Sequence, residues 1–310
     1  MKTYLIKRVL FLIPLLLGVT LLTFTLTKAL PGDPVFSLVG ERADPGVIEK
    51  IRKELGSEKD IVGQYLGYLK LLIRGEFGRS YHTNRRVFDD IKMKFPNTLK
   101  LAVGAMMIAV PAGLLFGFVA AQKRGKLLDR IISVFSVSGM SLPVFWSGLL
   151  LMFVFSLQWK ILPPSGTGGL QYLILPALTL SLPALGILSR ITRTTVLEII
   201  DAPFVKTAQA KGIKELKIQL VHVFRNALIP ITTVIGLEFA SYLNGAVLTE
   251  TIFGWDGIGR FTVEGIIKRD YPVIMGCVIT GTLVFIGINL LVDILYHYLD
   301  PRVRIDGRNR

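Results

Sequence analysis

The sequence predicts an all-α membrane protein with six transmembrane helices. Three observations lead to this prediction: the apolar content, its grouping into blocks, and the positive charge beside those blocks. Of the 310 residues, 51% are hydrophobic and only 19% are charged, which is too apolar for a soluble domain of this length. A net charge of +14 would also suit a nucleic-acid-binding protein, but here the cations flank the apolar blocks, which is typical of membrane topology.

Six apolar segments are long enough to cross a bilayer, which takes about 20 residues. The first follows a basic start, as the apolar region of a signal peptide does. It is longer than the roughly 7–15 residues of such a region and no small-residue cleavage site follows, so we predict an uncleaved first span. The predicted spans are residues 9–30, 101–121, 131–157, 173–189, 227–249 and 273–292.

The distribution of Lys and Arg predicts which side of the membrane each connection faces. The start, residues 122–130, residues 190–225 and the tail after Asp300 together hold 18 of these cations, whereas the short loops of the opposite set hold four. Basic residues are enriched in cytoplasmic loops. Both termini, and the long polar loop 194–225, are therefore predicted to be cytoplasmic.

The connection between the first two spans, residues 31–98, is long enough to fold. Asp44 is a candidate N-cap, Pro45 would occupy the first helical position, and Gly56 would end the helix. An apolar stretch rich in Tyr and Leu follows. We predict a small helical external subdomain and, since no repeat or linker divides the sequence, one membrane domain over residues 1–310.

The loop 194–225 is predicted to fold as a helix, a break and a second helix. Asp201 before Ala-Pro is typical of a helix start, and Gly212 is typical of a helix end. A short helix with small side chains suits docking into a cleft of another protein. An amphipathic helix equally suits an anionic bilayer surface, so both interpretations stay open. Apolar residues after the break recur at helical spacing, at Ile213, Leu216, Leu220 and Val223.

Glu238 lies well inside the fifth predicted span. A charge there is costly, so it is expected to face a water-filled path or to be paired within the packing. The sequence contains no G-x-x-x-x-G-K-[ST] phosphate-binding motif, and its histidines lie far apart, at His82, His222 and His297. The spans offer no nucleophile–base pair, which argues against an intramembrane enzyme.

Recognisable stretches follow one another along the chain, beginning with "TAQAKGI" and "HVFRNALIP" in the polar loop. The others are "LLTFTLTKALPGDPV", "GERADPGVIEKIRKELG", "GEFGRSY", "PNTLKLA", "GMSLPVFWSGLLL", "ILPALTLSLP", "ETIFGWDGIGR", "RDYPVIMG" and "NLLVDILYHYLDPRVR". As a set they resemble the B-type subunit of the dipeptide/oligopeptide/nickel family of ABC-importer permeases. The resemblance covers nearly the whole chain.

This resemblance implies a type I ABC importer permease fold and a transport role without catalytic residues. Two related permeases of such a system form the pore as a heterodimer, two cytoplasmic ATPases hold ATP and Mg, and an external binding protein delivers the substrate. The chain itself would bind no cofactor, metal or nucleic acid, and would lie in the inner membrane of a bacterium or archaeon. The polar loop resembles the helix that couples the permease to the ATPases, and the implied coupling residues are Thr207, Ala208, Ala210, Lys211 and Gly212.

The resemblance also implies residues of the transport path. Glu238 and Asn244 would line it, although the family more often has glutamine at position 238. Asp256 stands where the family usually has proline, so the loop before Gly257 is expected to turn differently. The external gate, or the contact with the binding protein, would involve Glu250, Phe253, Trp255 and Arg260.

The substrate expected from the resemblance is a di- or oligopeptide. The same importer class also carries nickel, glutathione and oligosaccharides, which stay open as alternatives. An ion-driven secondary transporter is a more distant alternative, because such proteins often carry internal repeats that this sequence lacks.

Overall fold

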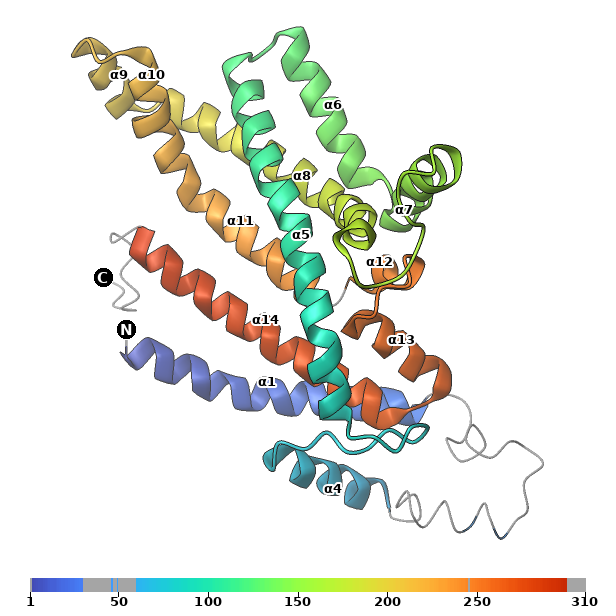
Figure 1. Cartoon of the computed structure of the whole chain (residues 1–310). Helices are drawn as coiled ribbons and strands as arrows, with labels where there is room; N and C mark the ends of the chain where they lie inside the picture. Colours follow the sequence, from blue (N-terminus) through green and yellow to red (C-terminus); the bar gives the residue numbers. More distant parts are fainter. Residues whose placement is uncertain (1, 30–45, 47–48, 50–59, 245, 300–310) are drawn as a thin grey trace. The chain divides into compact units, whose positions relative to one another are not determined.

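The protein is helical throughout the part that the structure describes. Figure 1 shows the computed structural model, in which every regular element of that part is a helix. An isolated antiparallel bridge joins Arg79 to Arg86. The all-α class is therefore confirmed, while Asp44, Pro45 and Gly56 lie outside the described residues, so the ends of the helix expected there stay a prediction. The described residues are 2–29, 46, 49, 60–244 and 246–299.

The chain divides into two compact units. Unit 1 combines Met1–Asn97 with Asp256–Leu283, and unit 2 combines Thr98–Trp255 with Val284–Arg310. Two long helices, α5 (Val87–Gln122) and α14 (Tyr271–Leu299), contribute residues to both units. The prediction of one membrane domain over residues 1–310 stays a prediction.

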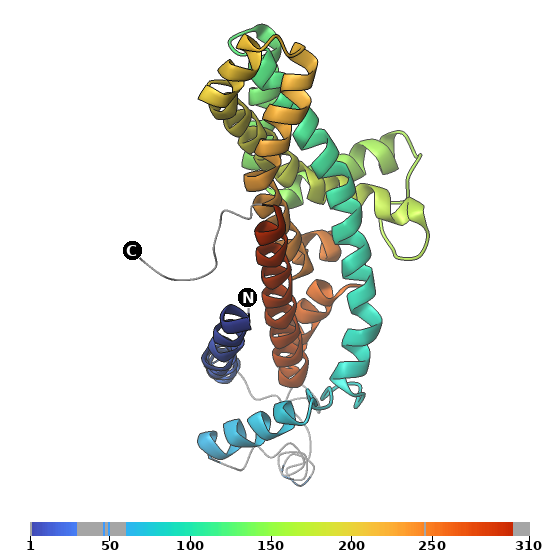
Figure 2. The same cartoon turned by 90° about the vertical axis from the view of Figure 1, so that its left-hand side faces the viewer.

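Unit 1 consists of helices around two small apolar clusters. Besides the first parts of α5 and α14 it holds α1 (Lys2–Ala29), α4 (Ile61–Ile73) and α13 (Ile258–Lys268). In Figures 1 and 2, α1 runs beside the first part of α14. The buried members of one cluster are Val87, Ile91, Ile258, Val273 and Cys277, and those of the other are Phe24, Tyr271, Ile274 and Met275.

Unit 2 holds one larger core between α5, α8 and α11, with the short helices α9 and α10 at the end of α8 and α11 (Figure 1). The apolar faces of these helices meet because burial of their aliphatic side chains stabilises the packed arrangement. The elements of this unit after α5 are α6 (Leu127–Ser141), α7 (Val144–Met152), η1 (Phe153–Gln158), α8 (Leu170–Ile200), α9 (Pro203–Ala210), α10 (Glu215–Lys217), η2 (Ile218–Phe224), α11 (Arg225–Leu243) and α12 (Val247–Ile252).

Two glycines let α5 approach α8 closely. A Cβ atom on Gly113 would lie 2.7 Å from the Leu188 Cβ, and one on Gly117 would lie 2.5 Å from the Thr192 Cβ. Neither distance is possible for real atoms. The small residues spaced four apart therefore form a helix-packing face, as is common in membrane helices.

Within the described residues, three helices are long and apolar enough to cross a membrane, or up to five if each bent pair counts as one span. The helices α5, α8 and the Tyr271–Val292 part of α14 qualify alone. Two bent pairs would each add one: α6 with Val144–Gln158, and Glu215–Leu228 with Pro230–Leu243. The apolar helix Leu12–Lys28 within α1 is shorter, so the predicted total of six stays a prediction.

The third predicted span, residues 131–157, is wrong as a single helix. Helix α6 ends at Ser141, and the chain turns by 103° before it continues as α7. Leu142 is extended (φ −73°, ψ 129°) because the ring of the following Pro143 disfavours a helical residue before it. The fifth predicted span, 227–249, ends earlier than expected, since α11 stops at Leu243.

Candidate functional site

The polar segment after α8 begins and ends where its turn residues require. Ala202 is the extended N-cap of α9, and Pro203 takes the first helical position, whose N–H needs no helical partner. Gly212 has φ +72°, so the predicted break at this residue is confirmed. The Ile213 amide donates to the Ala208 carbonyl (3.3 Å) and the Gly212 amide to the Gln209 carbonyl (2.9 Å), which is the Schellman helix ending.

One of the predicted coupling residues is buried and the other four are exposed. Ala208 is buried (6% exposed) together with Val205, and both belong to the core of unit 2. Ala208 therefore holds α9 to the rest of the chain and presents no side-chain surface to a partner in this conformation. The other predicted coupling residues are exposed: Thr207, Ala210, Lys211 and Gly212.

The apolar face predicted for the second helix is right at two positions and wrong at two. Val223 is buried and Ile213 packs against the core, whereas Leu216 and Leu220 are 72% and 51% exposed and Ile218 is buried instead. Part of this segment is the π-helical turn η2, whose hydrogen bonds join residues five apart. Its wider turn changes which positions face the core. Sequence periodicity that assumes 3.6 residues per turn misses this shift.

Polar contacts connect the turn between α5 and α6, and the start of α6, to the last part of α8, to Asp201 and to η2. Arg193 on α8 donates two hydrogen bonds to Asp129 on α6, at 2.6 and 2.9 Å. The Gln122 amide donates to Gln219 on η2 at 2.8 Å, and Arg124 lies 4.0 Å from Asp201. Sequence reasoning missed these pairs. The available signal was Asp129 itself, an acid at the start of an otherwise apolar helix.

The two residues predicted for the transport path both lie at α11. Glu238 is half-buried, and its carboxylate makes no hydrogen bond or ion pair with any other described residue. Asn244 is the exposed C-cap of the helix. Six residues apart on an α-helix correspond to about 120° around the axis, so the two side chains do not share one face. Nearby, the Tyr242 hydroxyl donates to the Leu180 carbonyl of α8 at 2.7 Å.

Most of the residues predicted for the external gate are interior. Glu250, Phe253 and Trp255 are 0%, 2% and 3% exposed. The Thr98 hydroxyl donates to Glu250 at 2.7 Å, and the Trp255 amide donates to the Glu250 carbonyl at 2.8 Å. Direct contact of these three side chains with another protein is therefore at odds with this conformation, because the chain itself covers them. Their role in a gate stays a prediction.

Arg260 and Asp256 belong to unit 1. Arg260 is partly exposed and pairs with Glu264, one helical turn further on, at 3.0 Å. Asp256 forms an ion pair with Lys94 on α5. The Asn97 side-chain amide also donates to the Asp256 carbonyl at 2.9 Å. These contacts connect the loop before Gly257 to α5.

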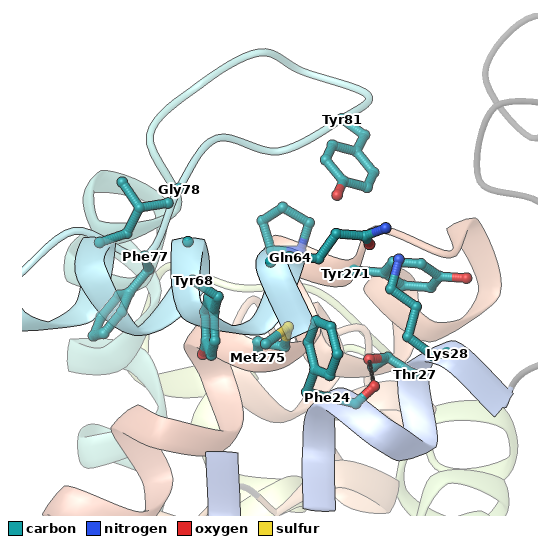
Figure 3. Close-up of a pocket in the computed structure, with 14 residues that line it drawn as sticks. Phe24, Thr27, Lys28, Gln64, Tyr68, Phe77, Gly78, Tyr81, Tyr271 and Met275 are labelled. Atoms are coloured by element: carbon teal, nitrogen blue, oxygen red, sulfur yellow. Dashed lines mark hydrogen bonds between the residues drawn. The ribbon is translucent and has the colours of Figure 1, made fainter. Parts of the chain in front are cut away.

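Unit 1 also encloses a cavity of about 370 Å³ that sequence reasoning did not anticipate (Figure 3). The Lys28 ammonium lies 5.4 Å from the centre of the Tyr271 ring and 5.8 Å from that of Phe24. Burial, followed by the neighbouring Asp270 carboxylate, raises the pKa of the Tyr81 hydroxyl, which therefore stays protonated. The cavity suits an apolar or aromatic group. Its aromatic lining comes from Phe24, Tyr68, Phe77, Tyr81 and Tyr271.

These features define a multi-pass membrane protein that presents a folded polar segment between its apolar helices. Residues 113–305 match the family described as "Binding-protein-dependent transport system inner membrane component", and residues 1–102 match the N-terminal region of that family. The chain belongs to this family of inner-membrane transport permeases, and its role is transport without catalysis.

Several characterised relatives match over nearly their whole length. The Di/tripeptide transport system permease protein DppB of Pseudomonas aeruginosa (strain UCBPP-PA14) is 40% identical, over 98% of this chain and 99% of the relative. The Glutathione transport system permease protein GsiC of Escherichia coli (strain K12) is also 40% identical, with the same coverage.

One solved structure shows the fold. A chain of the MetNI methionine ABC transporter, determined in inward-facing conformations, matches with a TM-score of 0.58 and 14% identity. The match covers 68% of this chain and 96% of that chain. The predicted ABC importer permease fold is therefore confirmed.

Proposed function

We propose that this chain forms half of the translocation pore of an ATP-driven importer for di- or oligopeptides. A second, homologous permease would complete the pore as a heterodimer. An external binding protein would deliver the peptide, and two ATPases on the cytoplasmic side would supply the energy from ATP and Mg. The peptide assignment is supported by relatives named for di/tripeptide and glutathione transport, and glutathione itself remains the first alternative substrate.

The observation that carries this proposal is the arrangement of α9. Val205 and Ala208 are buried and pack the helix against the core. Thr207, Ala210 and Lys211 are exposed. Phe204 is 45% exposed on the same short helix. A helix that is held rigidly while small residues and one aromatic ring remain uncovered suits a close-packed contact with a soluble partner.

Replacement of a single alanine on each side of α9 tests this contact. Ala210→Trp places a large ring on the exposed side, so the permease should fold normally while the ATPases dissociate or hydrolyse ATP without peptide uptake. Ala208→Trp is the matched structural control, because overpacking of the core should lower the yield of folded permease. Lys217→Ala, on the exposed side of α10, should change little.

The measurements are subunit retention, ATP hydrolysis and peptide uptake in liposomes containing the purified complex. Normal uptake by the Ala210→Trp complex with all subunits attached would argue against a docking role for α9. The alternative in which this segment rests on anionic lipid would then be the better explanation, and a dependence of Lys211 and Lys214 variants on lipid charge would support it.

For the transport path, we assign Glu238 to its wall. A half-buried carboxylate with no bonding partner among the described residues is expected to meet water or a passing ligand. In intact complexes, Glu238→Gln should leave the folded yield unchanged and reduce uptake modestly, whereas Glu238→Leu should reduce uptake more strongly. An equal loss of folded complex in both variants would indicate structural pairing instead.

A further inference from the structure

Asp129 and Arg193 form a two-pronged ion pair between α6 and α8. The Arg193 Nε lies 2.6 Å from one carboxylate oxygen of Asp129 and a terminal guanidinium nitrogen lies 2.9 Å from the other. The Asp129 side chain is 6% exposed and that of Arg193 is 31% exposed. Parallel bonds of this kind fix the relative orientation of two groups as well as their distance.

The Asp129 carboxylate also bonds groups other than Arg193. It accepts a hydrogen bond from the Gly125 amide at 2.9 Å and one from the Ser133 hydroxyl at 3.4 Å. Gly125 has φ +76° and forms the tight turn between α5 and α6. One buried carboxylate therefore connects this turn, the start of α6 and the side of α8.

Helix α8 leads from this ion pair directly to α9. It is continuous to Ile200, and α9 begins at Pro203, about 15 Å along the chain from Arg193 at 1.5 Å per helical residue. The two other contacts between the turn and this region, Arg124 with Asp201 and Gln122 with Gln219, are exposed. Exposed polar pairs contribute little, so among these three polar contacts the buried ion pair is expected to be the strongest.

On the other side of the ion pair, α6 lies tightly along α8. A Cβ atom on Gly139 would be 3.0 Å from the Leu182 carbonyl oxygen, and one on Gly186 would be 2.8 Å from the Met140 Cγ. The buried Ser136 and Ser189 hydroxyls are hydrogen-bonded at 2.9 Å. These contacts set the distance between the two helices through small and neutral groups. The ion pair adds a charged, two-pronged contact between the same helices.

We propose that Asp129 and Arg193 are positioning residues that make α6 follow α8 when α9 is displaced. The inference rests on the proposed function, since it assumes that ATP-driven movement enters through α9. Without the pair, movement of α9 would be absorbed at the turn before α6, and ATP hydrolysis would continue with less substrate carried. Removal of Arg193 also leaves the buried Asp129 carboxylate without its cation, which loosens the junction further.

The test compares uptake per ATP hydrolysed in liposomes that contain the complete transporter with its binding protein and a dipeptide. Asp129→Asn and Arg193→Gln should each lower this ratio roughly fivefold or more, the lower end of typical coupling between sites. All subunits should be retained. Arg193→Lys, which keeps the charge but loses the two-pronged geometry, should lie in between. The double variant should be no worse than either single variant, since both remove the same contact.

Two matched controls come from the same region. Arg190→Gln removes an exposed cation one turn earlier on α8, and Arg124→Gln removes the exposed, 4.0 Å contact to Asp201. Both should keep the wild-type ratio. A loss as large as that of Arg193→Gln would mean that positive charge in this region matters and the ion pair does not.

Replacement of the ion pair by a covalent crosslink distinguishes a positioning role from a folding defect. In a Cys277→Ser background, cysteines at positions 129 and 193 are joined by a short bis(methanethiosulfonate) reagent, which forms a disulfide with each thiol as methanesulfinate leaves. We expect low uptake per ATP before crosslinking, recovery after it, and loss again on reduction. An unchanged ratio in the Asp129→Asn variant, or equal losses of ATP hydrolysis, uptake and folded complex that crosslinking cannot restore, would overturn the proposal. Failure of the wild-type complex to couple ATP hydrolysis to uptake would contradict the proposed function instead.

Discussion

Thr98 donates its hydroxyl hydrogen to Glu250 across 2.7 Å, and both side chains are buried. The contact joins α5 to α12 over a sequence separation of 152 residues. Thr98→Val keeps the shape of the side chain but withdraws a donor from a buried carboxylate. We expect the free energy of unfolding to fall by about 1–3 kcal/mol.

Thermal unfolding of the purified permease in detergent measures this loss. The matched control is Thr251→Val on α12, where an exposed threonine bonds only the Val247 carbonyl of its own helix. Equal melting temperatures for the Thr98 and Thr251 variants would contradict a structural role for the buried pair.

Gly117 is predicted to be intolerant of any side chain. A Cβ atom there would overlap the Ser189 carbonyl oxygen and approach the Thr192 Cβ to 2.5 Å. Gly117→Ala should therefore push α5 away from α8 and cost about 1–3 kcal/mol. Gly104→Ala, on the same helix, would meet Ala177 at an ordinary 3.4 Å and should be neutral or slightly stabilising. Thermal unfolding in detergent measures the stability of both variants. Similar stabilities would contradict the close approach of α5 to α8 at Gly117.

Gly212 is predicted to be required for its backbone conformation alone. Its φ is +72°, and no atom lies within 4 Å of the position that a Cβ would take. Gly212→Val should destabilise the end of α9 by about 1–2 kcal/mol, and Gly212→Asn by less, since asparagine tolerates the left-handed region. Limited proteolysis of the segment should be fastest for the valine variant. Ala210→Val, at an exposed helical position, is the control, and cleavage of it at the Gly212→Val rate would contradict the backbone explanation.

The orientation in the membrane is predicted from the basic residues, 18 on one side against four on the other. In a Cys277→Ser background, single cysteines are introduced at the exposed positions Lys206 and Thr83. A membrane-impermeant maleimide added to intact cells should label the cysteine at 83 and leave the one at 206 unlabelled until the membrane is opened. The reverse pattern would invert the proposed topology and remove α9 from the cytoplasm.

The sequence by itself determined the class of the protein and much of its local structure. Hydropathy and turn chemistry are properties of neighbouring residues, so the apolar helices, the proline start of α9 and the break at Gly212 could be predicted. The ordered set of motifs was sufficient to recognise the permease family.

Only the tertiary structure decided which side chains are inside. Ala208 and Glu250 were expected at contacts with other proteins, yet both are buried, and Glu250 meets Thr98 from a helix far away in the sequence. The π-turn at η2 rotates the buried face by an amount that a regular helical period cannot express. The pairing of Asp129 with Arg193 spans 64 residues, and a single sequence contains nothing that links the two. Such contacts depend on where whole helices come to rest, and that is set by the packing of the entire core.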